Sequence, residues 1–350
     1  MKKRQSNFEL LRIVAMCMII AMHYITKGMS VPKLSVDSSV SNHFYWLVYA
    51  FCLVAVNVYV LISGYFLVDS EWHISKVIKL WIEVLVYSIL IPLVLGALGV
   101  ISISEISFGN WQQILLPVEY EHYWFATAYV MMFLLSPVLS MAVKHMSMNQ
   151  LRNVILALLV VFCGFKSINP YLIPWDRYGC DFVWFICLFL IAGYIRLYGI
   201  KLFSSKSKSV LIYVIATLAT FVICSIYAVI VRATGKLEYS MDMTYAYNYV
   251  TVLIASVAMF YVFLYMADSV NSSKLCPTIN KLAGCTFGVY LIHENILIRE
   301  RWSHWLGIDN VQGTWWQIFH MIFCIIVIFT VCAFIDMVRG WIFKAFSKKR

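Results

Sequence analysis

Long apolar blocks separated by short polar segments make up most of the sequence. A transmembrane helix needs about 20 mainly apolar residues to cross a hydrocarbon core of about 30 Å. Ten blocks come near this length, and they predict ten spans. Their approximate ranges are 9–27, 43–67, 77–103, 123–143, 152–168, 181–199, 209–231, 246–267, 284–299 and 314–340. The fifth and ninth blocks are short for a bilayer, which leaves a tilted, broken or re-entrant helix as the alternative for each.

The polar segments between the blocks are too short for a second domain. Residues 1–350 are therefore expected to form one all-α membrane domain without a soluble part. The basic residues 2–4, followed by an apolar run, are also compatible with a cleavable signal peptide. Because no small-residue cleavage pattern follows Met22, we favour a first helix that is retained.

Composition and charge support this interpretation. Hydrophobic residues make up 62% of the chain and charged residues only 13%, whereas soluble domains carry about 25% charged residues. The net charge of +10 comes without a phosphate-binding loop or nucleic-acid motif, so nucleic acid is not an expected partner. Most Lys and Arg residues fall in alternate segments, including 196–208 and 344–350. This bias predicts a multi-pass protein of the plasma membrane with both termini cytoplasmic.

Two polar residues of the first span lie on one helical face. His23 follows Arg12 by eleven positions, which is three helical turns plus about 20°, or about 16 Å along the axis. Glu9 lies one turn before Arg12 and is close enough to pair with it. Taken singly, Arg12 could reach the headgroups and His23 could be interfacial beside Tyr24. Their shared face instead favours a functional role in the bundle interior.

Several motifs occur in an order that resembles one known family. Arg12 and His23 match the Arg-x10-His signature of the membrane acyltransferase-3 family, and "FELLRIVAM" resembles its first helix. Further segments that resemble the family are "NVYVLISGYFL" (57–67), "KVIK" (76–79), "HYWFATAYVMMFLLSP" (122–137) and "TFGVYLIHENIL" (286–297). Together they cover the whole chain. Departures are Lys76 and Lys79 where arginine is common, Tyr129 and Val130 where one branch has an acidic pair, and the lack of a hydrolase-like domain.

The resemblance implies transfer of an acyl group, usually acetyl from acetyl-CoA, to a carbohydrate hydroxyl. His23 would then be the general base, because an imidazole titrates near neutral pH, or it would carry the acyl group covalently. Arg12 is the second predicted catalytic residue. Acetyl-CoA, or another acyl-CoA, is expected as a donor substrate, with no permanently bound cofactor and no metal.

The resemblance also suggests binding residues. Lys76 and Lys79 would contact the phosphates of the donor at the inner face, although they could simply anchor a helix end. The predicted substrate-binding residues are His122, Trp124, Tyr129, His293 and Glu294. Trp124 could instead belong to an interfacial aromatic belt, and the polar pair His293 and Glu294 could link helices structurally.

Four further positions within spans have simpler interpretations. Ser63 and Gly64 are expected to allow close packing of helices. Glu83 and Asp336 each require a basic partner that the sequence does not identify.

Two alternatives to an acyltransferase remain at this point. One is a transporter or flippase of a lipid-linked sugar, whose polar residues would line a pathway. The other is a membrane sensor that only binds a ligand. For the acyltransferase, the expected partners are an acyl-CoA, a carbohydrate acceptor, the lipid bilayer and glycan-assembly proteins. The sequence does not identify the acceptor.

Overall fold

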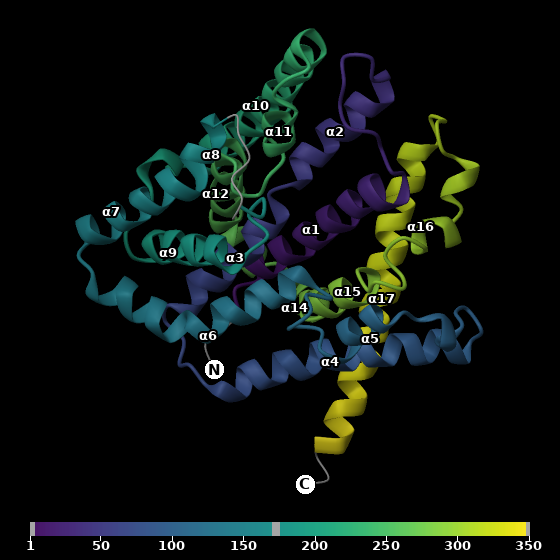
Figure 1. Ribbon diagram of the computed structural model, residues 1–350. Coiled ribbons are helices and arrows are strands. Elements are labelled where there is room, and N and C mark those ends of the chain that lie inside the picture. Colours follow the sequence, from purple (N-terminus) through teal and green to yellow (C-terminus); the bar gives the residue numbers. More distant parts are fainter. Residues whose placement is uncertain (1–3, 170–175, 348–350) are drawn as a thin grey trace. The chain divides into compact units, whose positions relative to one another are not determined.

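The computed structural model describes residues 4–169 and 176–347, and its regular secondary structure is helical (Figure 1). No strand occurs in these two ranges. The predicted all-α class is therefore confirmed for the described part of the chain.

Within the described ranges, seven helical segments are long and apolar enough to cross a membrane, so the predicted count of ten is not confirmed. The seven are Ser6–Gly28, Val40–Leu67, Ile74–Ala97, Trp124–His145, Met148–Ile168, Lys206–Thr234 and Gln317–Ala345. Two further apolar helices, Phe182–Tyr198 and Val250–Leu264, are shorter. The predicted ninth span, 284–299, contains only an eight-residue helix, Thr286–His293. His293 and Glu294 therefore lie at the end of a short helix and not inside a continuous span.

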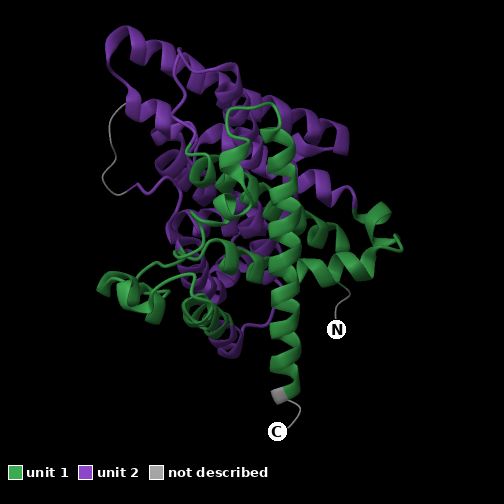
Figure 2. Ribbon diagram, turned by 90° about the vertical axis from the view of Figure 1, so that its right-hand side faces the viewer, with its two compact units in different colours: residues 1–30, 80–123, 267–350 green, residues 31–79, 124–266 purple. Residues whose placement is uncertain are grey.

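The chain divides into two compact units that alternate along the sequence (Figure 2). Unit 1 contains 1–30, 80–123 and 267–350, and unit 2 contains 31–79 and 124–266. The boundary at residues 79 and 80 falls within helix α4, Ile74–Ala97. Whether 1–350 acts as one domain stays a prediction.

Unit 1 is built around α1, which packs against α13, α14, α15 and α17. Its elements are α1 Ser6–His23, η1 Tyr24–Gly28, most of α4, η2 Ile103–Glu105, α5 Phe108–Leu115, α13 Ala267–Asn271, α14 Cys276–Ala283, α15 Thr286–His293, α16 Trp302–Trp305, η5 Ile308–Asn310 and α17 Gln317–Ser347. The apolar face of α1, including Phe8, Leu11 and Ile20, is almost completely buried. This packing fixes the end of α1, where His23 lies.

Unit 2 contains the remaining helices. They are α2 Val40–Cys52, α3 Ala55–Leu67, the first turn of α4, α6 Trp124–His145, α7 Met148–Leu159, η3 Val160–Gly164, α8 Phe165–Ile168, α9 Phe182–Tyr198, η4 Lys201–Phe203, α10 Lys206–Thr234, α11 Glu238–Met243 and α12 Val250–Leu264. A Cβ at Gly64 of α3 would lie 2.9 Å from Cβ of Ala192 and 3.0 Å from Cα of Phe189, both in α9. The predicted close packing at Gly64 is thus confirmed.

Candidate active site

His23 is the last residue of α1 and directly precedes a five-residue π-helical segment, Tyr24–Gly28. Single π-helical turns are rare and occur frequently at functional sites. The ring of the fully buried Tyr24 holds this turn in place, because its hydroxyl is 2.9 Å from Nδ1 of His320. Nε2 of His320 is in turn 2.9 Å from the carbonyl oxygen of Leu306 and donates to it. The π-helical turn is therefore anchored to Leu306, which follows α16, and to α17.

The central contact of the site joins His23 to His293 at the end of α15. Nδ1 of His23 lies 3.1 Å from Nε2 of His293. Nδ1 of His293 is 2.6 Å from the carbonyl oxygen of Val289, which can only accept a hydrogen bond. A neutral His293 therefore carries its proton on Nδ1 and accepts at Nε2. His23 must then donate from Nδ1, which leaves the lone pair of its Nε2 available to take a proton.

A carboxylate and two cations complete the cluster. Oε2 of Glu294 lies 3.1 Å from Nδ1 of His23. Oε1 of Glu294 pairs with the ammonium of Lys27 and lies 3.8 Å from Nη1 of Arg299. Since the Glu294 side chain is only 5% exposed, its charge requires these partners. Nε of Arg299 also lies 3.9 Å from Oε1 of the exposed Glu300, so two cations and two carboxylates meet beside His23.

Exposure separates the two histidines. The side chain of His23 is 16% exposed, whereas His293 is completely buried. His23 is therefore the more exposed histidine of the pair, and His293 is the enclosed one. The sequence left two roles open for His293 and Glu294, contact with substrate or a structural link between helices. Their burial favours the structural link, in which both side chains hold His23 in place.

The backbone around Glu294 is held by a second layer of buried side chains. The hydroxyl of Tyr123 donates to the carbonyl oxygen of Leu291 at 2.9 Å, and it accepts from Nδ2 of Asn295 at the same distance. Both Tyr123 and Asn295 are completely buried. These bonds fix the end of α15, so the position of His293 is determined by more than its own contact with His23.

His122, predicted to bind substrate, is also buried in unit 1. Its Nδ1 lies 3.1 Å from the carbonyl oxygen of Gln113, and its Nε2 accepts from the amide of Ile296 at 3.4 Å. Burial lowers the pKa of His122 to about 4, although the bond to Gln113 acts in the opposite direction. A neutral His122 therefore connects the segment after α5 to the segment after α15. Contact with substrate stays a prediction.

Arg12 forms the ion pair that its spacing predicted. Its Nη1 lies 3.2 Å from Oε2 of Glu9, and its side chain is 30% exposed. By helix rise it is about 16 Å from His23 along α1. A catalytic role for Arg12 stays a prediction.

The remaining predicted site residues belong to unit 2. Trp124 stacks on Tyr247, with ring centroids 5.7 Å apart. The ring of Tyr129 stacks between Phe125 and Phe133, and its hydroxyl lies 3.1 Å from Oγ of Ser63. Trp124 and Tyr129 thus belong to an aromatic row along α6, and their contact with substrate stays a prediction.

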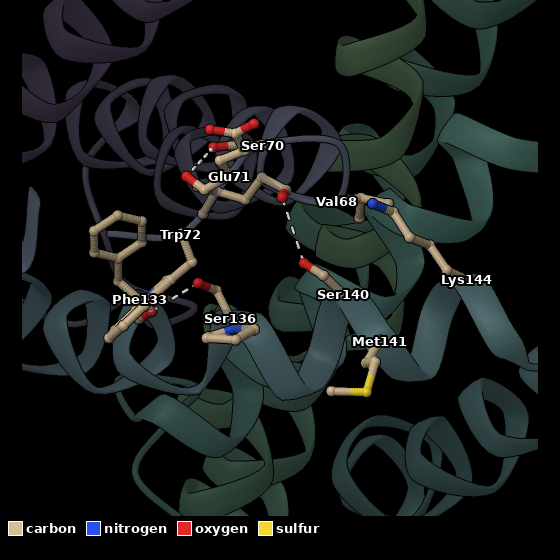
Figure 3. A pocket seen from close by; sticks show the side chains of 11 residues that line it. Val68, Ser70, Glu71, Trp72, Phe133, Ser136, Ser140, Met141 and Lys144 are labelled. Atoms are coloured by element: carbon tan, nitrogen blue, oxygen red, sulfur yellow. Dashed lines mark hydrogen bonds between the residues drawn. The ribbon is translucent and has the colours of Figure 1, made fainter. Parts of the chain in front are cut away.

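Lys76 and Lys79 lie exposed within the first two turns of α4. Nζ of Lys76 donates to the carbonyl oxygen of Glu71 at 2.7 Å and to Oγ of Ser70 at 3.3 Å. Ser70 and Glu71 line a cavity of about 230 Å³ in unit 2. Figure 3 shows its lining side chains, which include Trp72, Phe133, Ser136, Ser140, Met141 and Lys144. Lys76 is therefore bonded to the rim of a cavity that also presents hydroxyls, an aromatic ring and the ammonium of Lys144.

Sequence reasoning missed Lys27, Arg299 and the partner of the acidic residues at 83 and 336. Lys27 lies one turn after His23, which is a local signal for a shared face. Arg299 and its contact with Glu294 carried no comparable signal. The basic partner of Glu83 and Asp336 is Arg339, whose Nη2 lies 2.6 Å from Oε1 of Glu83 and 2.8 Å from Oδ1 of Asp336.

Among the residues described, no group of three or more His, Cys, Asp and Glu side chains could hold a metal ion.

These features define a helical membrane protein with a histidine-centred polar cluster at the end of its first helix. The sequence model of the acyltransferase-3 family, described as an acyltransferase domain, matches residues 5–337. The chain therefore belongs to this family and is a membrane acyltransferase. No curated protein and no solved structure matched the chain.

Proposed function

We propose that the protein transfers an acetyl group from acetyl-CoA to a hydroxyl of a cell-surface or lipid-linked glycan, with His23 as the general base. One observation carries this proposal. The contact between His23 and the buried His293 orients the accessible imidazole so that Nε2 carries the lone pair. A sugar hydroxyl is a weak nucleophile, and a neutral imidazole nitrogen is suited to remove its proton near pH 7.

In the proposed reaction, the sugar oxygen attacks the thioester carbonyl while its proton moves to Nε2 of His23. The resulting imidazolium is stabilised through Nδ1–H, which faces His293 and the carboxylate of Glu294. Breakdown of the tetrahedral intermediate breaks the carbon–sulfur bond, and the proton on His23 passes to the departing thiolate. The products are the acetyl ester and CoA. Attack by His23 itself, with an acetyl-imidazole intermediate, is the two-step alternative.

Lys27 and Arg299 suit the electrostatics of this step. Negative charge develops on the carbonyl oxygen of the thioester in the transition state, and fixed positive charge nearby stabilises it. Glu294 lies between these two cations, and the exposed Glu300 is a second carboxylate beside Arg299. We assign the two cations to the oxyanion and the carboxylate of Glu294 to the imidazolium.

We assign the phosphates of the donor to Lys76 and Lys79 of unit 2. Lysine binds phosphate as a point charge. Lys76 donates to Ser70 at the rim of the cavity, whose lining includes Lys144, three serines and Trp72 as further donor contacts. In the orientation inferred from charge, the first turn of α4 and the end of α6 lie on the cytoplasmic side, where acetyl-CoA is present. The plasma membrane and cytoplasmic termini are part of this proposal. The family match favours transfer over a flippase or a sensor.

The proposal is tested with purified protein in lipid nanodiscs, radiolabelled acetyl-CoA and a membrane glycan fraction as acceptor. We expect label on the glycan, and a burst of label on the protein only if the acetyl-imidazole route operates. His145→Ala is the matched control for His23→Ala, because His145 is an exposed histidine at the end of α6. It should transfer label like the wild type. Absence of label from both glycan and protein would overturn the proposal.

A further inference from the structure

Two adjoining cavities lie in unit 2, in a part of the chain that none of the family motifs covers. Their volumes are about 130 and 240 Å³, and they share Lys33, Leu34 and Met241 as lining residues. Together they reach the range of about 300–1,000 Å³ that is typical of small-molecule sites. They are formed by the segment before α2, by α11 and by the C-terminal half of α10. The other lining residues are Ser35, Val36, Asp37, Trp46, Cys224, Ala228, Val231, Arg232, Glu238, Asp242 and Tyr245.

Rigid aromatic rings form one wall of the smaller cavity. The rings of Trp46 and Tyr245 lie 5.0 Å apart, and Tyr49 packs against both. Trp46 Nε1–H donates to the carbonyl oxygen of Pro32 at 2.9 Å, and the Tyr245 hydroxyl donates to the carbonyl oxygen of Trp46 at 3.2 Å. These bonds hold the rings in one orientation, so a flat ligand can stack on them at little cost in side-chain entropy.

Charged side chains surround the cavities. Nζ of Lys33 lies 2.7 Å from Oδ2 of Asp242 and 3.2 Å from Oε1 of Glu238, yet the Lys33 side chain remains 59% exposed. Nη1 of Arg232 lies 2.8 Å from Oδ1 of Asp37. The rim therefore presents both hydrogen-bond donors and acceptors. Three carboxylates against two cations give this rim a net charge of −1.

We propose that these cavities bind a neutral pyranose unit of the acceptor glycan, an inference that rests on the proposed function. A pyranose presents C–H groups on its faces and hydroxyls around its edge. The faces fit the fixed rings of Trp46 and Tyr245 and the apolar floor at Leu34 and Met241. Each hydroxyl both donates and accepts, which matches a rim of paired ammonium and carboxylate groups.

The charges decide between this occupant and two others. A uronic acid or a phosphodiester would bring negative charge to a rim whose net charge is already negative. A lipid chain would require an apolar entrance, whereas the cavities are lined by charged side chains that are 30–76% exposed, namely Lys33, Asp37, Arg232, Glu238 and Asp242. The segment before α2 and the segment between α10 and α12 also belong to loops that the charge bias places outside the membrane. A surface glycan would approach from that side.

The test is saturation-transfer NMR on the purified protein in nanodiscs, without acetyl-CoA. The probes are maltotriose, cellotriose and triacetylchitotriose as neutral sugars, with trigalacturonic acid as the anionic comparison. We expect at least one neutral trisaccharide to bind and trigalacturonic acid to bind more weakly. Lys33→Gln should weaken that binding about tenfold, the equivalent of one hydrogen bond to a charged group. Trp46→Ala should weaken it by about the same factor, because it removes the ring on which the sugar stacks. Lys206→Gln, at the opposite end of α10, should leave binding unchanged.

Folding of each variant is checked by its thermal unfolding midpoint, and the exposed Lys33 keeps the test interpretable if Trp46→Ala unfolds. Absence of binding by all three neutral sugars overturns the proposal. Equal binding to wild type and Lys33→Gln also overturns it, as does displacement of the sugar by added phospholipid. Because the readout contains no donor, this result is independent of acetyl transfer. Sugar binding without transfer would refute the proposed function alone, and transfer without sugar binding would refute this site alone.

Discussion

Nδ1 of His23 lies 3.1 Å from Nε2 of His293, although 270 residues separate them in the sequence. The bond from His293 to the carbonyl oxygen of Val289 sets the direction of that contact, so His23 is the donor. The accessible histidine of the pair is thereby prepared to accept a proton at its other nitrogen.

The first prediction concerns His293 as a positioning residue. His293→Ala removes the acceptor that orients His23, and we expect kcat to fall about tenfold to a hundredfold, the rate equivalent of one hydrogen bond to a charged group. KM for acetyl-CoA should change little. His293→Gln keeps an acceptor oxygen and should retain more activity than His293→Ala. Steady-state kinetics of both variants check this, and a wild-type kcat in His293→Ala would contradict the assigned role.

The second prediction concerns the buried ion pair of Lys27 and Glu294. Glu294→Gln leaves Lys27 without its carboxylate, whereas Arg299 keeps the exposed Glu300, and loss of one partner of a buried pair costs about 3–5 kcal/mol. We expect a lower thermal unfolding midpoint for Glu294→Gln in detergent. Lys27→Met in the same chain should restore part of the loss. If the two substitutions are strictly additive in unfolding free energy, the side chains are not coupled.

The third prediction concerns the donor. Lys76→Ala and Lys79→Ala should raise KM for acetyl-CoA more than they change kcat, because phosphate contacts bind the ground state and the transition state alike. The effect should shrink as salt is added, since both lysines are exposed and salt screens exposed charges. Lys206→Ala serves as the matched control. Unchanged donor affinity in both folded variants would show that Lys76 and Lys79 do not bind the donor. Their role would then be to anchor the end of a helix.

The fourth prediction concerns the charged group in α4 and α17. Arg339→Met leaves Glu83 and Asp336 facing each other without a cation, and the thermal unfolding midpoint should fall by several degrees. Arg339→Lys keeps the charge but not the planar fork, and it should give an intermediate midpoint. Lys206→Met should have no effect. A midpoint equal to that of wild type for Arg339→Met would show that this group does not stabilise unit 1.

Local patterns predicted the parts of the fold that depend on neighbours along the chain. The apolar block at 9–27 became the helical segment Ser6–Gly28, and the spacing of Glu9 and Arg12 gave their ion pair. The block at 284–299 was predicted less well. Hydropathy measures how apolar a segment is but not where its helix ends, and the helix there ends at His293.

Contacts between distant segments could not be predicted in the same way. Nothing in the sequence around Lys27 indicates that it pairs with Glu294, and nothing around Glu83 indicates Arg339. The sequence did show that Glu83 and Asp336 lie within apolar blocks, where a charge without a partner is unfavourable. It therefore predicted that partners exist, and only the packing of the helices identifies them.

The most direct test of the account is the rate of acetyl transfer by His23→Ala under saturating acetyl-CoA. Loss of a positioned base typically lowers the rate about 10²–10⁴-fold. Donor binding should stay near the wild-type level, because the proposed phosphate contacts are made by Lys76 and Lys79. A folded His23→Ala protein with kcat below about a hundredth of wild type and normal acetyl-CoA affinity is the predicted result. A kcat above about a tenth of wild type would contradict His23 as the base.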